Sequence, residues 1–286
     1  MSQVEIQEWS ISEGNSEVEA FLSRPAFAPE AEKAAATVLA DIRERGDEAV
    51  LEAARKFDGA DLETSEMLVS AEEMKAAVKA VPPRIKAAVK QAYERIMAYA
   101  KAGLKEPWFM QTPKGGYTGE IYSPMDRVGV YIPGGTAPLA STALMTVTLA
   151  KAAGVKEIVA CTPCKADKQV NPVLLYGLKV AGATEIYKVG GIQSIGLMAF
   201  GTDTVRKVQK IAGPGNAFVT AAKRQVYGFV AIDQVAGPSE IAILADNTPN
   251  PAWVTADLLS QAEHGSGHEK SLLVTSSRAL MPPCKL

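Results

Sequence analysis

The sequence predicts an α/β protein in which a doubly wound, mostly parallel sheet follows a helical N-terminal portion. Apolar residues recur at helical spacing over roughly the first 110 residues. From Arg127 onward, short β-branched runs alternate with helical stretches of about 10 to 16 residues, which is the pattern of repeated βα units. Glycine-rich turns close several of these runs, and such strand ends are where ligands bind in open α/β sheets.

The N-terminal portion is predicted to contain a series of amphipathic helices. The first ends at Gly46, and Asp47 is placed to cap the second. Ser70 opens a third helix, and Pro83 lies at the start of a longer one. The longer helix has an apolar stripe that we interpret as a core-packing face rather than a partner-binding face, formed by Ile85, Val89, Ala92, Ile96 and Tyr99.

Six strands are predicted in the α/β portion, with alanine-rich helical segments between them. They are RVGVYIP, EIVACTP, EIYKVG, KVQKIAG, GFVAIDQV and SEIAILAD. The turns that close these strands contain Gly134-Gly135, Gly190-Gly191, Gly213-Pro214-Gly215-Asn216 and Gly237-Pro238-Ser239. A further apparent strand, SLLVTSS, is followed only by RALMPPCKL, so we expect the chain to stop inside a domain, with its C-terminal part missing.

Composition argues against several classes of protein. Thirty Lys and Arg residues against 32 Asp and Glu give a formal charge of −2 without a basic block, so nucleic-acid binding is not expected. No apolar run is long enough for a membrane span, and the N-terminus lacks the pattern of a signal peptide. An odd number of cysteines, three, fits a reducing compartment, so we expect a cytoplasmic protein.

The glycine-rich turns are weak signals when each is taken alone. They suit close approach of a phosphate or a nucleotide, yet neither GxGxxG nor GxxxxGK[ST] is present, and a tight βα turn is the simpler reading. Asn216 is more specific, because it can cap the following helix and still offer an amide to a ligand. A plain N-cap remains the alternative.

Two further motifs also allow a structural interpretation. Gln261 and His264 share one helix face about a turn apart and could reach one metal ion, although two such ligands make a poor zinc site and a solvated histidine is the alternative. Cys161 and Cys164 form a CxxC without a second pair, so we interpret them as buried thiols rather than redox groups.

Taken together and in this order, five segments resemble the histidinol dehydrogenase family: VYIPGG, VGGIQSIG, KIAGPGNAFVTAAKRQVYG, IDQVAGPSEIAILAD and DLLSQAEH. The resemblance implies a zinc-dependent, homodimeric, cytosolic enzyme. It implies oxidation of L-histidinol through L-histidinaldehyde to L-histidine with NAD, the last step of histidine biosynthesis. It also implies two Rossmann-like domains, residues 1–130 with 239–286 and an inserted NAD-binding domain, residues 131–238.

The resemblance assigns roles to particular residues. The family's NAD contacts match Tyr131, Gln193 and Asn216. Its substrate-contacting serine matches Ser239, and its zinc ligands, which also touch substrate, match Gln261 and His264. The family's catalytic Glu-His pair has no match in this sequence, so no catalytic residue is assigned and turnover by this chain is expected to be impaired.

Two alternative functions share these observations. One is a related dehydrogenase that acts on another small alcohol, such as a sulfonated diol, although the AGPSE segment favours the histidinol enzymes. The other is a non-catalytic fragment that binds a dinucleotide.

Overall fold

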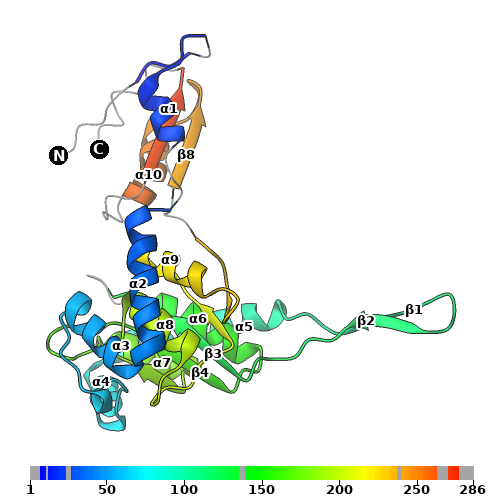
Figure 1. The fold of residues 1–286 in the computed structure, drawn as a ribbon. Helices are drawn as coiled ribbons and strands as arrows, with labels where there is room; N and C mark the ends of the chain where they lie inside the picture. Colours follow the sequence, from blue (N-terminus) through cyan, green and yellow to red (C-terminus); the bar gives the residue numbers. More distant parts are fainter. Residues whose placement is uncertain are drawn as a thin grey trace. The chain divides into compact units, whose positions relative to one another are not determined.

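The computed structural model describes residues 7–10, 12–23, 27–134, 139–236, 240–262 and 270–276. The chain forms two compact units (Figure 1), one of Met1–Ala28 with Ala236–Leu286 and one of Pro29–Val235. Both this division and the expected domains are discontinuous in the sequence. The structure places residues 29–130 in the unit that contains the five-stranded sheet. The resemblance instead implies one domain of residues 1–130 with residues 239–286. That division into domains remains a prediction for the whole protein.

The larger unit is built on a five-stranded sheet with the order β5-β4-β3-β6-β7. Every neighbouring pair in this sheet is parallel. The strands are β3 (Arg127–Tyr131), β4 (Glu157–Cys161), β5 (Glu185–Tyr187), β6 (Lys210–Ala212) and β7 (Ala231–Ile232). All five residues of β3 are buried, as expected for the central strand of a parallel sheet. The predicted Rossmann-like arrangement is therefore confirmed.

Helices cover both faces of this sheet, and the N-terminal helices contribute to both layers (Figure 1). On one face, α4 (Ala71–Ala80) and α5 (Pro83–Ala102) pack with α6 (Ala140–Ala152) and α7 (Pro172–Ala181). On the other, α2 (Pro29–Arg45) and α3 (Asp47–Ala53) pack with α8 (Gly191–Phe200), and α2 also contacts α9 (Ala217–Val226). The N-terminal portion is thus part of the sheet's own core. The core-packing interpretation of its apolar stripe is confirmed for Val89, Ala92 and Ile96. It is wrong for the two ends of the stripe, because Ile85 and Tyr99 are exposed.

The helix boundaries largely follow the predicted caps. Ser70 accepts a hydrogen bond from the backbone N–H of Glu73, whose side chain in turn accepts from Ser70 N–H, so α4 begins with a capping box. The predicted role of Asp47 is wrong. Gly46, at φ +57°, is the N-cap residue of α3, and Asp47 instead accepts a hydrogen bond from the Thr204 hydroxyl at 2.9 Å.

A hairpin that the sequence analysis did not predict extends from the larger unit (Figure 1). It consists of β1 (Trp108–Gln111) paired antiparallel with β2 (Tyr117–Glu120). All eight residues of the two strands are exposed. Because neither face is buried, the hairpin lacks the apolar alternation by which a strand is recognised.

The smaller unit contains α1 (Ser16–Leu22), β8 (Glu240–Ala245), α10 (Pro251–Ala262) and β9 (Lys270–Thr275). Strands β8 and β9 pair in parallel. Val254 and Leu258 of α10 pack on Ile241, Ile243 and Leu273 of these strands, forming a small core. The predicted strands in SEIAILAD and SLLVTSS are both confirmed.

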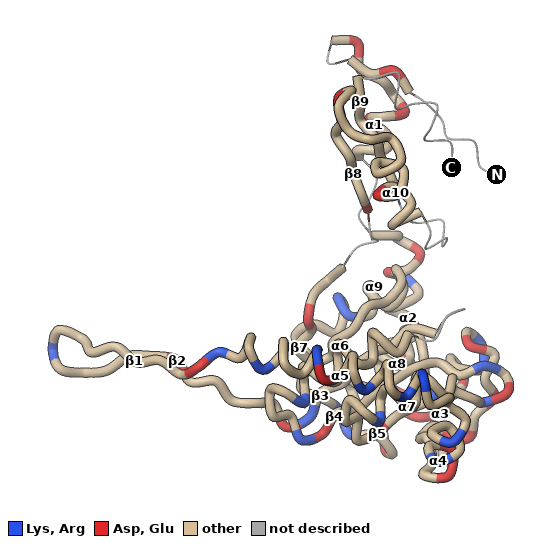
Figure 2. Tube along the Cα trace, turned by 180° about the vertical axis from the view of Figure 1, so that it is seen from behind, with Lys and Arg blue, Asp and Glu red and all other residues tan. Residues whose placement is uncertain are grey.

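Lys, Arg, Asp and Glu residues alternate along the part of the larger unit's chain that is drawn in colour (Figure 2). Among the described residues, no helix is both long and apolar enough to cross a bilayer.

Candidate functional site

The carboxyl ends of β3 and β6 form the point at which the strand order of the sheet reverses. From β3 the chain proceeds outward through β4 and β5, then crosses back to β6 on the other side of β3. Val130 of β3 lies opposite Ala212 of β6, so Tyr131 and Gly213 leave the sheet next to each other. A reversal of this kind opens a crevice outside the strand ends, where ligands of open α/β sheets bind.

Gly213 allows the chain after β6 to pass close to β3. Its φ of +126° is unfavourable for other residues, and a Cβ at this position would lie 2.2 Å from the carbonyl oxygen of Tyr131. The Gly213 N–H donates to Asp233 Oδ2 at 2.8 Å, and its carbonyl accepts from Lys223 Nζ at 2.8 Å. Lys223 also forms an ion pair with Asp233. Three interactions therefore fix the turn that leads to Asn216.

Asn216 occupies the N-cap of α9. Its Oδ1 accepts hydrogen bonds from the backbone N–H groups of Phe218 and Val219, both at 3.1 Å. The residue is exposed, and within the described part of the chain its Nδ2 has no hydrogen-bond partner. The cap explains why an asparagine fits here, and the cap leaves the amide donor free for a ligand.

Tyr131 ends β3 with a buried ring whose residue is 4% exposed. Its hydroxyl oxygen accepts a long hydrogen bond, 3.4 Å, from the backbone N–H of Gly191 at the start of α8. Burial raises the pKa of Tyr131 to about 12, so the phenol is neutral near pH 7. The ring thus joins the end of β3 to the turn that carries Gln193.

Gln193 lies in the first turn of α8 and is 1% exposed. Its Nε2 donates to Asp58 Oδ2 at 2.9 Å. Asp58 is the last residue of the π-helix η1 (Ala54–Asp58) and is half-buried. Burial raises the pKa of Asp58, although hydrogen bonds from the backbone of Gly190 and from Gln193 partly offset this effect. The structure therefore places a carboxylate beside the glutamine that the resemblance assigns to NAD.

Sequence reasoning missed Asp58 as a site residue. It lies 135 residues before Gln193, and no spacing rule connects the two. The available signal was Asp58-Gly59 at the end of a predicted helix, which indicates only a turn.

The glycine at position 190 is explained by packing. A Cβ there would lie 2.5 Å from the Cβ of Pro163, which follows β4, and 3.1 Å from Asp58 Oδ2. The close contact between these two strand ends requires a residue without a side chain. For this turn the simpler reading, a tight βα connection, is sufficient.

The cysteines are buried thiols, as predicted. Cys161 and Cys164 are both buried and unpaired. Burial raises the pKa of each, which disfavours the reactive thiolate.

The residues predicted to bind substrate and zinc belong to the smaller unit. Gln261 lies near the end of α10, and its Oε1 is buried without a hydrogen-bond partner in the described part of the chain. Ser239 and His264 lie outside the described residues. Among those that are described, no group of three His, Cys, Asp or Glu side chains could hold a metal ion.

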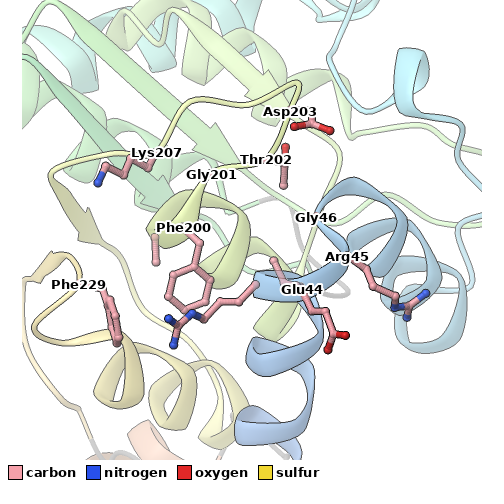
Figure 3. A pocket seen from close by; sticks show the side chains of 12 residues that line it. Glu44, Arg45, Gly46, Phe200, Gly201, Thr202, Asp203, Lys207 and Phe229 are labelled. Atoms are coloured by element: carbon pink, nitrogen blue, oxygen red, sulfur yellow. The ribbon is translucent and has the colours of Figure 1, made fainter.

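A separate hollow of about 490 Å³ lies where α2 and α8 end (Figure 3). Because α8 runs from the Gly190 turn back toward the start of β6, its far end lies at the amino ends of the strands, away from the crevice. The cation of Arg45 is paired with Asp41 and Glu52, and Arg43 stacks on two phenyl rings that lie on one side of the hollow, those of Phe200 and Phe229. These side chains already interact with one another, so we do not assign a ligand to this hollow.

The strand order, the reversal at β3 and β6, and the helices on both faces define an α/β protein of the Rossmann-like class. Residues 23–284 match the sequence profile of the histidinol dehydrogenase family. The chain therefore belongs to the histidinol dehydrogenase family.

Similarity to individual relatives extends over most of the chain. It is 44% identical over 254 residues to the histidinol dehydrogenase of Symbiobacterium thermophilum, covering 89% of this chain and 57% of that protein. It is 43% identical over 270 residues to that of Methanosarcina barkeri, covering 94% and 62%. The crystal structure of histidinol dehydrogenase from Elizabethkingia anophelis matches with a TM-score of 0.81 at 40% identity, again over 94% of this chain and 62% of the other. The chain thus spans about 60% of the length of these relatives.

Proposed function

We propose that this chain supplies the dinucleotide-binding part of an NAD-dependent histidinol dehydrogenase, which oxidises L-histidinol through L-histidinaldehyde to L-histidine. The observation that carries the proposal is that three residues lie near the carboxyl ends of neighbouring strands of one sheet. Tyr131 and Asn216 follow the two strands at which the order reverses, and Gln193 is tied to Tyr131 through the Gly191 backbone. The homodimer and the cytoplasmic location implied by the resemblance are further predictions.

The free polar atoms of the crevice suit a dinucleotide. Asn216 offers an amide donor, and the Oε1 of Gln193 has no hydrogen-bond partner among the described residues. The riboses and the carboxamide of NAD have both donors and acceptors that could meet such groups. Bound NAD would supply the hydride acceptor, while these side chains bind and orient it.

Zinc is proposed at Gln261 and His264, with Ser239 on the substrate. The buried, unpartnered Oε1 of Gln261 fits a role as an oxygen ligand, because such an atom is costly to leave unsatisfied. Zinc would supply a Lewis acid for the substrate alcohol. Two protein ligands leave a zinc site incomplete, so tight metal binding and turnover belong to the whole protein, and no catalytic residue is proposed in this chain.

Titration calorimetry with NAD tests the proposal. We expect the folded chain to bind NAD weakly and Asn216→Ala to weaken binding further. Asn171→Ala is the matched control, because Asn171 caps α7 by accepting from the Val173 N–H in the same way. Asn171→Ala removes a comparable helix cap, and we expect it to leave the affinity for NAD unchanged. Absence of NAD binding by the folded chain, or equal affinity in Asn216→Ala, would contradict the proposal.

A further inference from the structure

The amide of Gln193 is held in one orientation by its surroundings. Its Nε2 donates to Asp58 Oδ2 at 2.9 Å, and its Oε1 has no hydrogen-bond partner among the described residues. The residue is 1% exposed, so each polar atom of the amide needs a partner from the protein or from a bound ligand. The end of η1 therefore determines how this amide is presented.

The chemistry of Asp58 decides which end of the amide turns toward it. An ionised carboxylate has acceptor oxygens and no donor, whereas a glutamine amide has a donor end and an acceptor end. Reversing the amide would place Oε1 against the carboxylate, two acceptors in contact in a buried place. The NH₂ group of Gln193 must therefore face Asp58, and the carbonyl oxygen of the amide remains free to accept a hydrogen bond from another group.

We propose that Asp58 is a positioning residue that makes Gln193 present its carbonyl oxygen to a hydrogen-bond donor on the dinucleotide. This inference rests on the proposed function. The complementary ligand group is a donor such as a ribose hydroxyl or the carboxamide NH₂. A phosphate oxygen, which only accepts, would be unsuited to this position.

Asp58→Asn changes only the hydrogen-bonding character of the positioning side chain. Asparagine can both donate and accept, so the amide of Gln193 is free to reverse. We expect the dissociation constant for NAD to rise roughly 2- to 12-fold, the value of one neutral hydrogen bond. Asp61→Asn is the control. Asp61 lies three residues after Asp58, and it is an exposed carboxylate paired with Arg55.

A double variant distinguishes positioning from a merely structural role. Gln193→Glu alone places two carboxylates in contact and weakens NAD binding. In Asp58→Asn/Gln193→Glu the asparagine donates to one glutamate oxygen, and the other oxygen still presents an acceptor to the ligand. We expect the double variant to recover NAD affinity toward that of the wild type. Unchanged affinity in Asp58→Asn, or losses that simply add in the double variant, would overturn the inference.

The proposed function and the inference fail in different ways. If the wild-type chain binds no NAD, the proposed function is wrong, and the side-chain amide signal of Gln193 in NMR then decides the inference. That signal must shift as Asp58 takes up a proton in the wild type, and must lose this shift in Asp58→Asn. An amide that is insensitive to Asp58 overturns the inference whatever the NAD result.

Discussion

At the scale of single residues, the crevice contains a carboxylate that the fold does not favour in its charged form. Burial raises the pKa of Asp58, and the nearby titratable groups, Tyr131 and Cys164, also have raised pKa values and are neutral near pH 7. A carboxyl group whose pKa is higher in the folded state stabilises the fold fully below its unfolded pKa, and this contribution is lost as pH rises through the folded pKa. Ionised Asp58 therefore serves the proposed site at the expense of stability.

Asp58→Asn is predicted to raise the melting temperature at pH 7. Asparagine keeps an acceptor for Gln193 and Gly190 but carries no buried charge. The difference in melting temperature between the variant and the wild type should disappear near pH 3, because Asp58 is then protonated and as neutral as asparagine. Thermal unfolding across this pH range checks the prediction, with Asp61→Asn as the exposed control. A lower melting temperature at pH 7 would mean that the charge stabilises the fold.

The pKa of Asp233, which forms an ion pair with Lys223, is shifted in the opposite direction from that of Asp58. Burial pushes the pKa of Asp233 up, but hydrogen bonds from Lys223 and Gly213 outweigh it and hold that pKa below its ordinary value. Its contribution to stability is present above the unfolded pKa and is lost as pH falls through the folded pKa.

Lys223→Met is predicted to lower the free energy of unfolding by about 3 kcal/mol at pH 7, because it leaves Asp233 and the Gly213 carbonyl without their buried partner. The loss should shrink on acidification, as Asp233 becomes protonated. Urea unfolding at pH 7 and near pH 3 measures this, and Lys207→Met, at an exposed position, is the control. A loss at pH 7 no greater than that of Lys207→Met would show that the pair does not stabilise the turn.

At the scale of elements, the geometry of the crevice depends on how closely the β6–α9 turn approaches the end of β3. Gly213 and Gly228 both have positive φ, +126° and +104°. They differ in space: a Cβ at position 213 meets the Tyr131 carbonyl at 2.2 Å, whereas one at position 228 meets nothing within 4 Å. Comparing substitutions at these two glycines therefore separates the cost of backbone strain from the cost of a steric clash with β3.

Gly228→Ala is predicted to cost about 1 kcal/mol through backbone strain alone, and Gly213→Ala distinctly more, because the turn must also move away from β3. Gly213→Ala should in addition abolish NAD binding, which Gly228→Ala should leave intact. Chemical unfolding and NAD titration of the two variants give both results. Equal losses of stability would contradict the close approach.

Element by element, the sequence was informative wherever burial imposes a pattern. The strands of the sheet follow from their β-branched runs, and Ser70 and Asn216 cap helices as their side chains predict. The β1–β2 hairpin could not be predicted, because both of its faces are exposed. Asp58 could not be placed in the crevice either, because its contact with Gln193 joins segments that only the tertiary fold brings together.

At the scale of the whole molecule, the proposed cofactor contacts and the proposed metal ligands belong to different compact units. Tyr131, Gln193 and Asn216 all lie in the unit of Pro29–Val235, whereas Gln261 lies in the other. The proposed dinucleotide site is therefore built entirely from one unit, with a five-stranded sheet covered on both faces. NAD binding is the part of the proposed activity that this unit can carry without the metal ligands.

Hydrogen exchange with and without saturating NAD, read by mass spectrometry, tests this account most directly. We predict that NAD slows exchange in residues 131–134, 190–193 and 213–219, which surround the carboxyl ends of β3 and β6. Residues 42–46 and 200–207, at the hollow near the amino ends of the strands, should exchange at the same rate in both samples. Protection at that hollow, or none at the strand ends under conditions where NAD is bound, would contradict the placement of the dinucleotide in the crevice.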